Sequence, residues 1–531
     1  MFKSLSIIFF LLSMLNIYSQ NLTINAEGKM IVGEGVKVTV EGNLVLKGPE
    51  SLEIKNSSFI VNGTSSGSGK MTYIKTIPQG SYQQISSPVV DQDVVEFIDK
   101  NPSIEAGKNE FSVNRGLYYY DYRTNKWVRN NSPDKDNNYI TKFKHGQGWI
   151  VRLNGESSDN GEISFEGTFQ NDNFRIGTYV EDLDHNEGLF GYIGNPYTSY
   201  IAVHKKGGDL DTFFGKNTDL LQEETVYMWD AVDRKYLLIN LTSSTTDYIE
   251  PAQGFFIKPK KEIAGLSFNH SMRRHKIKSK DQEKSSSSRH KIKSTDQEKS
   301  SSSRPEIKLM ITDGSSNKYT NIFYIEGTTT GFDNGYDSTI YDNGGDDFDI
   351  YTHLVSDSQG DDYGIQSLPN SDYETMVVPV GFNATSDTEI IISAAIVNFP
   401  AGISVYLEDK EDSSFTLLDN SATYTTTLSE DINGIGRFYL HTTSSVLSTD
   451  KVALNNHLSI YTSSKENIRI SGVYSGVAKL RMYNILGKQV LNTSFEGNGL
   501  NDIALPKNIS NGVYIVHLVT DLETVTKKIL I

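Results

Sequence analysis

The sequence contains no cysteine and only three tryptophans and thirteen prolines among its 531 residues. The absence of cysteine excludes disulfides, thiolate metal sites, cysteine nucleophiles and a lipid-modified N-terminal cysteine. Basic residues are outnumbered, since 50 Lys and Arg stand against 66 Asp and Glu and the formal charge is −16. An acidic chain does not neutralise phosphates, so a general nucleic-acid binder is excluded.

Long apolar runs are also missing, apart from one at the N-terminus. The run from Leu5 to Leu15 follows Lys3 and is shorter than the ~20 apolar residues that cross a bilayer. Together with the small residue Ser19 it has the layout of a secretory signal peptide, which we expect to occupy residues 1–19 and to be cleaved between Ser19 and Gln20. A membrane anchor is the alternative. We expect no transmembrane anchor elsewhere in the chain.

Motifs of catalysis are scarce as well. The sequence predicts no nucleophile elbow, zinc-protease helix, P-loop or dinucleotide-binding loop. Its ten histidines are scattered without the spacing of metal ligands. We therefore predict no catalytic residue and no cofactor other than a possible Ca²⁺ ion. A carbohydrate-active enzyme with two carboxylates stays open, because sequence gives no separations between acidic groups.

What the sequence does contain is β-forming residues and turns. It has 29 Tyr, 24 Phe and 43 Gly with 37% hydrophobic residues, which favours many short, half-buried strands. The length allows three to five structural units. We predict an all-β, multidomain protein with a short β-solenoid start, duplicated β-units, a β-sandwich domain and an immunoglobulin-like C-terminal domain.

The C-terminal residues alternate between apolar and polar, with turns at Asn498-Gly499 and Asn511-Gly512, which indicates a sandwich of short antiparallel strands. The segments RMYNILGKQVL (481–491), NDIALPKNISNGVYIVHLVTD (501–521) and the final TVTKKILI resemble the type A C-terminal sorting domain of the Bacteroidetes type IX secretion system, over about 455–531. Residues 459–463, Ser-Ile-Tyr-Thr-Ser, depart from the usual Pro-Asn-Pro entry.

That resemblance implies a route and a partner. The signal peptide would direct export across the inner membrane. The sorting domain would engage the type IX secretion machinery for passage across the outer membrane and would then be removed. The mature protein would be secreted or attached to the outer cell surface. The alternative is an ordinary immunoglobulin-like adhesive module, because fold alone does not decide role.

Residues 20–75 are expected to form a solenoid-like segment. Short apolar pairs such as Leu44 and Leu46 alternate with glycines such as Gly42 and Gly63, where tight turns are needed. Each rung buries its apolar face only against its neighbours, so the segment should lead into the units that follow.

Residues 76–271 contain an internal duplication, with β-units at 76–180 and 185–271. Four blocks recur in the same order at offsets of 103 to 109 residues, for example 146–150 (GQGWI) with 252–256 (AQGFF). Their aromatic residues suggest glycan binding by stacking, with Trp127, Trp149 and Trp229 as candidate ligand residues. The alternative is that these rings belong to the core or to cross-strand pairs.

Residues 272–305 change to a basic, serine-rich segment in which RHKIKSKDQEKSSSS (274–288) recurs as RHKIKSTDQEKSSSS (289–303). Few apolar residues are available, so we predict a disordered linker. Residues 271–308 hold 12 Lys and Arg against 5 Asp and Glu. This local charge would serve adhesion to acidic polysaccharide or lipopolysaccharide, or it would only keep a spacer extended. His275 and His290 are poor metal candidates.

Residues 306–445 return to strand patterns and are expected to form a β-sandwich-like domain. Its loops hold an acidic cluster, and hard cations prefer such oxygen ligands. The candidate Ca²⁺ ligands are Asp333, Asp337, Asp342, Asp346, Asp347 and Asp349. The same residues are common in turns, which is the alternative.

These features together predict an adhesin-like or binding protein at the cell surface, with polysaccharide or another surface ligand as its partner. The alternative is a component of polysaccharide utilisation, either a glycan-binding accessory or an enzyme. A purely structural role is also open.

Overall fold

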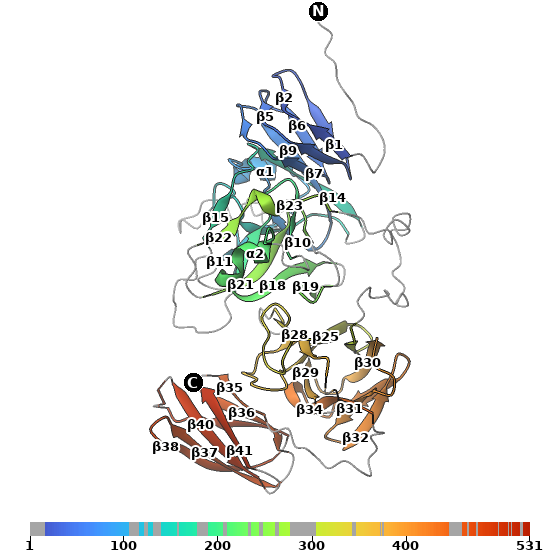
Figure 1. The fold of residues 1–531 in the computed structure, drawn as a ribbon, viewed down its shortest axis with the longest axis vertical. Coiled ribbons are helices and arrows are strands. Elements are labelled where there is room, and N and C mark those ends of the chain that lie inside the picture. Colours follow the sequence, from blue (N-terminus) through green and yellow to red (C-terminus); the bar gives the residue numbers. More distant parts are fainter. Residues whose placement is uncertain are drawn as a thin grey trace, which may run out of the picture. The chain divides into compact units, whose positions relative to one another are not determined.

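The computed structural model describes residues 16–531 with gaps at 106–115, 122–125, 131–139, 157–158, 178–189, 205–209, 232–234, 244–247, 261–264, 277–303, 342–346, 372, 374–375, 445–458, 465–466, 474–475, 498, 508, 511 and 521–523. The described chain is mostly β-strand, as predicted. It divides into two compact units, residues 1–298 and 299–531 (Figure 1). Residues 1–15 of the expected signal peptide lie outside the described residues.

The first unit begins with stacked coils of short parallel strands. Register partners such as Lys37 and Ser58 lie 21 residues apart, so each coil adds one strand to each of three sheets. A Cβ on Gly63 would lie 2.5 Å from the carbonyl oxygen of Gly42 in the coil below, which is why the turns need glycine. The three sheets are β1 (Asn16–Ser19), β4 (Lys37–Val40) and β7 (Ser58–Val61); β2 (Leu22–Ile24), β5 (Leu44–Leu46) and β8 (Ser65–Ser66); and β3 (Met30–Val32), β6 (Leu52–Lys55) and β9 (Met71–Pro78).

Two four-stranded antiparallel sheets of the same strand order follow. They are β10 (Tyr82–Ser86), β13 (Gly148–Arg152), β11 (Leu117–Asp121) and β12 (Lys126–Arg129), and then β16 (Gly191–Gly194), β21 (Gly254–Pro259), β18 (Leu221–Asp230) and β19 (Lys235–Ile239). Each strand holds the place of its sequence counterpart, which supports a duplication. The other elements are α1 (Val94–Lys100), β14 (Asn160–Gly167), β15 (Phe174–Ile176), β17 (Tyr200–Ala202), α2 (Phe213–Asn217), η1 (Thr218–Leu220), β20 (Tyr248–Ile249), β22 (Leu266–Phe268), η2 (His270–Met272) and β23 (Arg273–Arg274).

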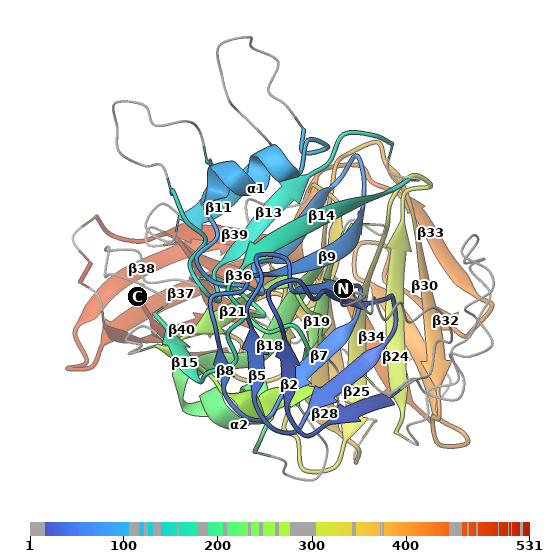
Figure 2. The ribbon, with the colours of Figure 1, turned by 90° about the horizontal axis from the view of Figure 1, so that it is seen from above.

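A buried asparagine ties the helix to a strand in each of the two repeats of the first unit. The Asn101 amide donates to the carbonyl oxygen four residues earlier at 2.8 Å and to Ser164 O at 3.0 Å, and Ser164 N donates back at 2.7 Å. Asn217 makes the same three bonds, with Ser267 as its strand partner. Figure 2 shows α1 beside the edge formed by β14. The blocks around Ser164 and Ser267 correspond in sequence, so the motif recurs with the repeat.

The two sheets contact each other through equivalent residues in both directions. Ile85 forms a bridge with Gln253, and its counterpart Ile193 forms one with Gln147. The Ser86 N–H donates to Ala252 O at 3.1 Å. At the corresponding positions the Gly194 N–H donates to Gly146 O at 2.8 Å. The pair is therefore related by an approximate two-fold axis.

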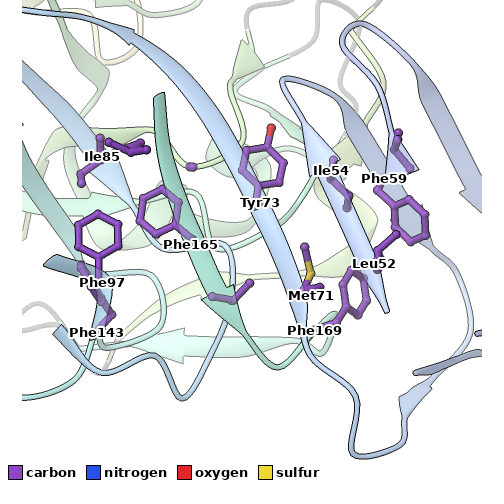
Figure 3. Packing of buried hydrophobic residues seen from close by; sticks show 14 of the residues in the cluster. Leu52, Ile54, Phe59, Met71, Tyr73, Ile85, Phe97, Phe143, Phe165 and Phe169 are labelled. Atoms are coloured by element: carbon purple, nitrogen blue, oxygen red, sulfur yellow. The ribbon is translucent and has the colours of Figure 1, made fainter. Parts of the chain in front are cut away.

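The coils and the first sheet share one hydrophobic core (Figure 3). Apolar side chains of the coils continue without a break into those around α1 and β14. This explains why three short coils are stable, since the last one is covered by the next unit. Its buried members include Leu52, Ile54, Phe59, Met71, Phe97, Phe143, Phe165 and Phe169.

We predicted a β-sandwich-like domain at residues 306–445, and the structure forms one continuous sheet of eleven strands there. The order is β32-β31-β34-β29-β27-β28-β25-β24-β30-β33, and β26 pairs with β28. The strands are β24 (Glu306–Thr312), β25 (Asn317–Ile325), β26 (Ser338–Thr339), β27 (Asp349–Thr352), β28 (Tyr363–Pro369), β29 (Val377–Ala384), β30 (Glu389–Val397), β31 (Ser404–Asp409), β32 (Ser414–Leu418), β33 (Thr423–Thr427) and β34 (Ile432–Thr443).

This sheet curls round its own core. Leu418 at one end of the strand order and Tyr424 at the other both pack in the same hydrophobic cluster. Across the seam the Tyr424 hydroxyl donates to Asp409 Oδ2 at 2.6 Å, and Arg437 Nη2 holds the same oxygen at 2.7 Å. Side chains thus link the two ends, between which the described strands have no main-chain pairing.

The C-terminal residues form two antiparallel sheets on one core, in agreement with the predicted sandwich. Ile460 and Ile470 from one sheet and Leu480 and Val516 from the other are all buried in this core. The sheets are β35 (Ser459–Ser464), β36 (Asn467–Val473) and β39 (Gly499–Ala504), and β38 (Gln489–Glu496), β37 (Val477–Asn484), β40 (Val513–Val519) and β41 (Thr524–Leu530).

Candidate ligand-binding face

The three tryptophans do not form one exposed surface. Trp149 is 0% exposed and lies in the core, where its ring packs on Tyr119 at 5.8 Å and Phe143 at 5.0 Å. It offers no ring face to a sugar, so the expected stacking at this position is wrong. The reason is the orientation of β13, because the face of this strand that carries Trp149 is turned towards the core that the first sheet shares with the coils.

Trp127 and Trp229 take part in reciprocal cross-strand pairs. Tyr120 on β11 faces Trp127 on β12, and at the corresponding positions Trp229 on β18 faces Tyr236 on β19. The Trp127 ring also packs edge-on against Tyr192 of the second sheet at 4.9 Å. Both tryptophans are half-buried, so cross-strand and inter-sheet packing accounts for their presence.

One face of the first sheet carries two tyrosines and two arginines, of which Tyr82 and Arg129 are exposed and Tyr118 and Arg152 are half-buried. Tyr82 on β10 pairs with Arg152 on β13, and Tyr118 on β11 pairs with Arg129 on β12. The tyrosine rings meet edge to face at 5.7 Å, and the guanidinium carbons lie 5.1 Å (Arg129 over Tyr118) and 5.6 Å (Arg152 over Tyr82) from the ring centroids. Because paired residues of neighbouring strands point to the same side, the four form one surface, which we call the Tyr–Arg face.

The electrostatics of the Tyr–Arg face favour an anionic ligand. Arg129 Nε donates to Tyr118 Oη at 2.8 Å, and no carboxylate among the described residues lies within ion-pair distance of Arg129. Arg152 lies 3.4 Å from Glu105, with both side chains more than a third exposed. Partial burial and a hydrogen bond to Tyr118 raise the pKa of Tyr82, so its ring stays neutral. Flat rings beside forked donors suit a ring-shaped molecule with carboxylate or sulfate groups.

Sequence analysis pointed to the aromatic residues of the repeats as a group, but it missed Tyr82, Arg129 and Arg152. A signal was available in this acidic chain, because an arginine ends each of two tryptophan-containing segments, KWVR (126–129) and GWIVR (148–152). A tyrosine-rich segment, LYYYD (117–121), lies close to them in the sequence. Only the strand register brings these four distant side chains together.

The second sheet carries the counterpart of this face in buried form. Phe190 and Tyr227 meet edge to face at 5.1 Å, as Tyr82 and Tyr118 do in the first sheet. Both are buried, at 7% and 0% exposure. Tyr227 Oη donates to the buried Glu223 carboxylate at 2.6 Å, and Lys258 lies 3.7 Å from that carboxylate.

The acidic loops of the second unit are organised by their own backbone. The Asp337 carboxylate is fully buried and accepts the N–H groups of Asp333 and Ser367, each at 2.6 Å. The Asp333 carboxylate accepts the N–H of Thr329 at 2.6 Å. Among the described residues no three His, Asp or Glu side chains are placed to hold a metal ion. Asp347 and Asp349 are among the described residues to which this finding applies. The candidate ligands Asp342 and Asp346 lie outside the described residues.

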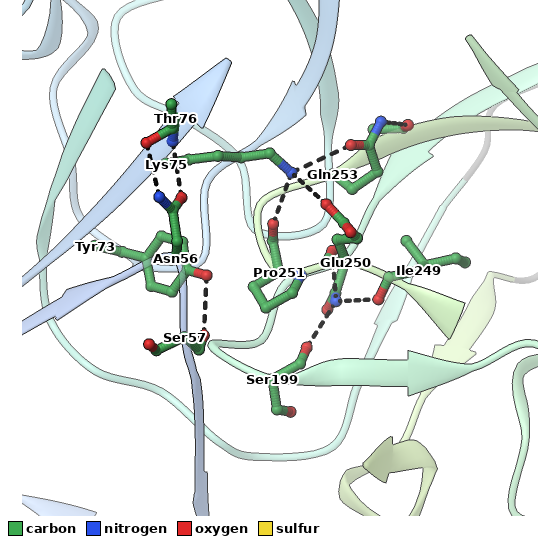
Figure 4. Close-up of polar contacts among 12 residues, drawn as sticks. Asn56, Ser57, Tyr73, Lys75, Thr76, Ser199, Ile249, Glu250, Pro251 and Gln253 are labelled. Carbon is green, nitrogen blue, oxygen red and sulfur yellow. Dashed lines mark hydrogen bonds and ion pairs between the residues drawn. The ribbon is translucent and has the colours of Figure 1, made fainter. Parts of the chain in front are cut away.

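Lys75 is a buried cation with a structural role (Figure 4). It reaches from β9 of the coils to the second repeat, where Nζ donates to Pro251 O at 3.0 Å and Gln253 Oε1 at 3.2 Å and lies 3.7 Å from Glu250. Burial lowers the pKa of Lys75. Its partners are all parts of the fold, so it fastens the coils to the turn before β21.

Two half-buried histidines are held in their neutral form. Burial lowers the pKa of His145 to about 4 and that of His275 to about 4. The His275 ring contacts the Ser58 hydroxyl at 2.7 Å and the Thr39 hydroxyl at 2.9 Å. Residues up to Lys276 thus belong to the folded unit, and the predicted linker start at residue 272 is too early. His290 lies outside the described residues.

A serine in a hydrolase-like string is also structural. Residues 63–67 (GTSSG) have the G-x-S-x-G spacing, but Ser65 and Ser66 form β8, which pairs in parallel with β5 instead of leading into a helix. Ser65 Oγ donates to Phe169 O at 3.3 Å. This string therefore is not a nucleophile elbow.

The expected processing site lies on the surface. Ser19 ends β1, and the following Gln20 is exposed. Within the part of the chain that the structure describes, no helix has the length and apolar character to cross a membrane.

Comparisons with known proteins identify both parts of the chain. No curated protein matches it. Among solved structures it is similar to one titled "Biofilm associated protein - BSP domain", over 86% of this chain and 92% of that one, at 9% identity and a TM-score of 0.18, which is too low to support an argument. Residues 455–531 match the family model of the secretion system C-terminal sorting domain, so the protein is a type IX secretion cargo that is secreted or attached to the outer surface. Residues 9–441 match a second model, and the chain therefore belongs to the family described as domain of unknown function DUF8693.

Proposed function

We propose that this protein is an adhesin-like binding protein that holds an acidic polysaccharide on the Tyr–Arg face after export. The observation that carries the proposal is the alternation of two tyrosines and two arginines across four strands on one side of the first sheet, with Tyr82 and Arg129 exposed. Tyrosine and arginine give large contact area and directed hydrogen bonds at modest entropic cost, so they dominate binding surfaces.

The charge balance supports an acidic ligand in particular. The chain as a whole carries −16, so it repels polyanions except where cations are concentrated. Arg129 and Arg152 supply such a place, and their planar forks match uronate carboxylates or sulfate esters. Neutral glucans would use only the rings and should bind more weakly.

The test is a binding assay with the mature full chain against alginate, polygalacturonate and a sulfated glycan, with laminarin as the neutral reference. Arg129→Ala and Tyr82→Ala should each weaken binding to the acidic polymer about tenfold, the loss of one charge-assisted bond or one stacked ring. Arg175→Ala is the matched control, because this exposed arginine lies on β15, outside the face. Equal affinity of the three variants would contradict the proposal.

The same samples should be assayed for new reducing ends. A binding protein leaves the polymer intact, whereas release of sugars that depends on this chain would favour the alternative of a carbohydrate-active enzyme in polysaccharide utilisation. A binding constant that falls steeply with added salt would agree with the ionic part of the proposal.

A further inference from the structure

The outer face of the sheet β38-β37-β40-β41 in the sorting domain has an unusual composition. Cross-strand register places its side chains in rows, of which one is Asn492, Arg481, His517 and Thr526, and the next holds Ser494, Lys479, Val519 and Thr524. Lys479, Arg481 and Lys528 are exposed, and Glu496 at one corner is the only acidic side chain among the described residues of this face. Residues 455–531 hold 8 Lys and Arg against 5 Asp and Glu, whereas the chain as a whole is acidic.

Large apolar side chains are exposed on the same sheet. Val477 is 49% exposed and Val519 is 37% exposed. At the turn between β37 and β38, Ile485 is 75% and Leu486 is 87% exposed. Ile485 and Leu486 are the most exposed aliphatic side chains of the described chain. They are adjacent at one end of the sheet, whereas Val477 and Val519 lie at its other end beside Lys479. Clustered exposed apolar residues mark interaction sites more often than scattered ones do.

The turn that carries Ile485 and Leu486 is held in a single conformation. The Asn484 side-chain oxygen accepts the N–H groups of Leu486 at 3.1 Å and Lys488 at 2.9 Å, and Asn484 N donates to Lys488 O at 3.0 Å. Gly487 has φ +77°, which glycine adopts without strain. The two aliphatic side chains are therefore presented on a preformed support, which lowers the entropic cost of docking.

We propose that this face, with the Ile485–Leu486 turn at its end, is the docking surface of the sorting domain for a protein component of the export machinery that offers an apolar hollow bordered by acidic side chains. The cations require an acidic rim, and the aliphatic turn requires an apolar hollow. The rows also contain Ser494, Asn492 and Thr526, whose polar groups a protein surface can match but a lipid interior cannot. This inference is independent of glycan binding, because it concerns a different domain.

The test is export of the full chain from cells that carry the type IX system, measured as the ratio of extracellular to periplasmic protein. Ile485→Ser combined with Leu486→Ser, and separately Lys479→Glu combined with Arg481→Glu, should each lower this ratio at least tenfold with retention in the periplasm. The matched controls are Leu417→Ser, an exposed leucine on β32, and Lys47→Glu, an exposed lysine of the coils. Both controls should be exported normally.

Two further measurements decide between explanations. Thermal unfolding of the purified double variants should match the unchanged protein, because the replaced side chains are exposed, and a matching melting curve with lost export supports docking. Normal export of both double variants would overturn the proposal. Binding of the unchanged full chain to vesicles of anionic phospholipid, lost in the same variants, would also overturn it in favour of a membrane surface.

Discussion

The two repeats of the first unit share a strand order and a helix-anchoring asparagine, yet they use one equivalent position in opposite ways. In the first repeat, Tyr82 and Tyr118 lie at the surface with two arginines. In the second, Phe190 and Tyr227 keep the same edge-to-face geometry but are buried with Glu223 and Lys258. The comparison teaches that a duplicated scaffold preserves the ring pair for packing, while exposure and the accompanying charges decide whether it is available for binding.

The largest expected effect comes from truncating the equivalent tyrosines. Tyr227→Ala should lower the free energy of unfolding by about 3–5 kcal/mol, because it removes a fully buried ring and leaves Glu223 without its hydroxyl partner. Tyr118→Ala should cost about 1 kcal/mol and act mainly on polysaccharide binding. Urea unfolding followed by tryptophan fluorescence measures both, since all three tryptophans lie in the two repeats. Similar losses in the two variants would show that the repeats do not differ in this way.

The asparagine anchors should behave alike in the two repeats. Asn101→Ala and Asn217→Ala each remove three hydrogen bonds and leave buried main-chain groups unpaired, so each should cost about 2–4 kcal/mol. The same fluorescence assay applies. The exposed Asn420 lies in the second unit, which contains no tryptophan. Its replacement by alanine should therefore leave the tryptophan fluorescence of the unfolding curve unchanged. A large loss in only one of the anchor variants would contradict structural equivalence.

Acid should destabilise the first repeat more than the second. His145 has a pKa of about 4 in the folded protein, below the ordinary value of a histidine, and its counterpart in the second repeat is Pro251. The unfolded chain therefore takes up the proton first, and the stabilisation present above pH 6.5 is lost as the pH falls towards 4, by up to about 3 kcal/mol.

His145→Gln removes that titration and should flatten the dependence of unfolding free energy on pH between 6.5 and 4. His275 also has a pKa of about 4, so part of the slope should remain until it too is replaced. An unchanged slope in the His145 variant would show that this ring is not neutral and buried in solution.

The smallest effect concerns the turn where the repeats contact each other. Gly146 has φ +75° and its counterpart Ala252 has φ +55°. A Cβ on Gly146 would lie 2.9 Å from the Phe174 ring, so Gly146→Ala should cost about 1–2 kcal/mol. Ala252→Gly should change stability by less than about 1 kcal/mol, because relief of strain is offset by chain entropy. Equal effects at the two positions would mean that the turns are not equivalent.

Much of the architecture was predictable where it depends on local pattern. Glycines at 21-residue spacing, the recurring blocks of the duplication and the sorting-domain segments all follow from short-range periodicity and turn chemistry. Three features were not predictable. Trp149 is a core residue because of the side of the sheet it occupies. The strands β24 to β34 curl as one sheet, and Arg273 to His275 join the fold through partners more than 70 residues away.

The sequence by itself determined the export route, the all-β class and the order of the repeats, because signal-like ends, strand periodicity and duplicated motifs are properties of neighbouring residues. Only the tertiary structure decided which aromatic rings are exposed and which cations accompany them. Exposure depends on which face of a sheet the rest of the chain covers, and a shift of one residue in strand register reverses it. The Tyr–Arg face therefore exists only in the folded protein, although each of its four residues is printed in the sequence.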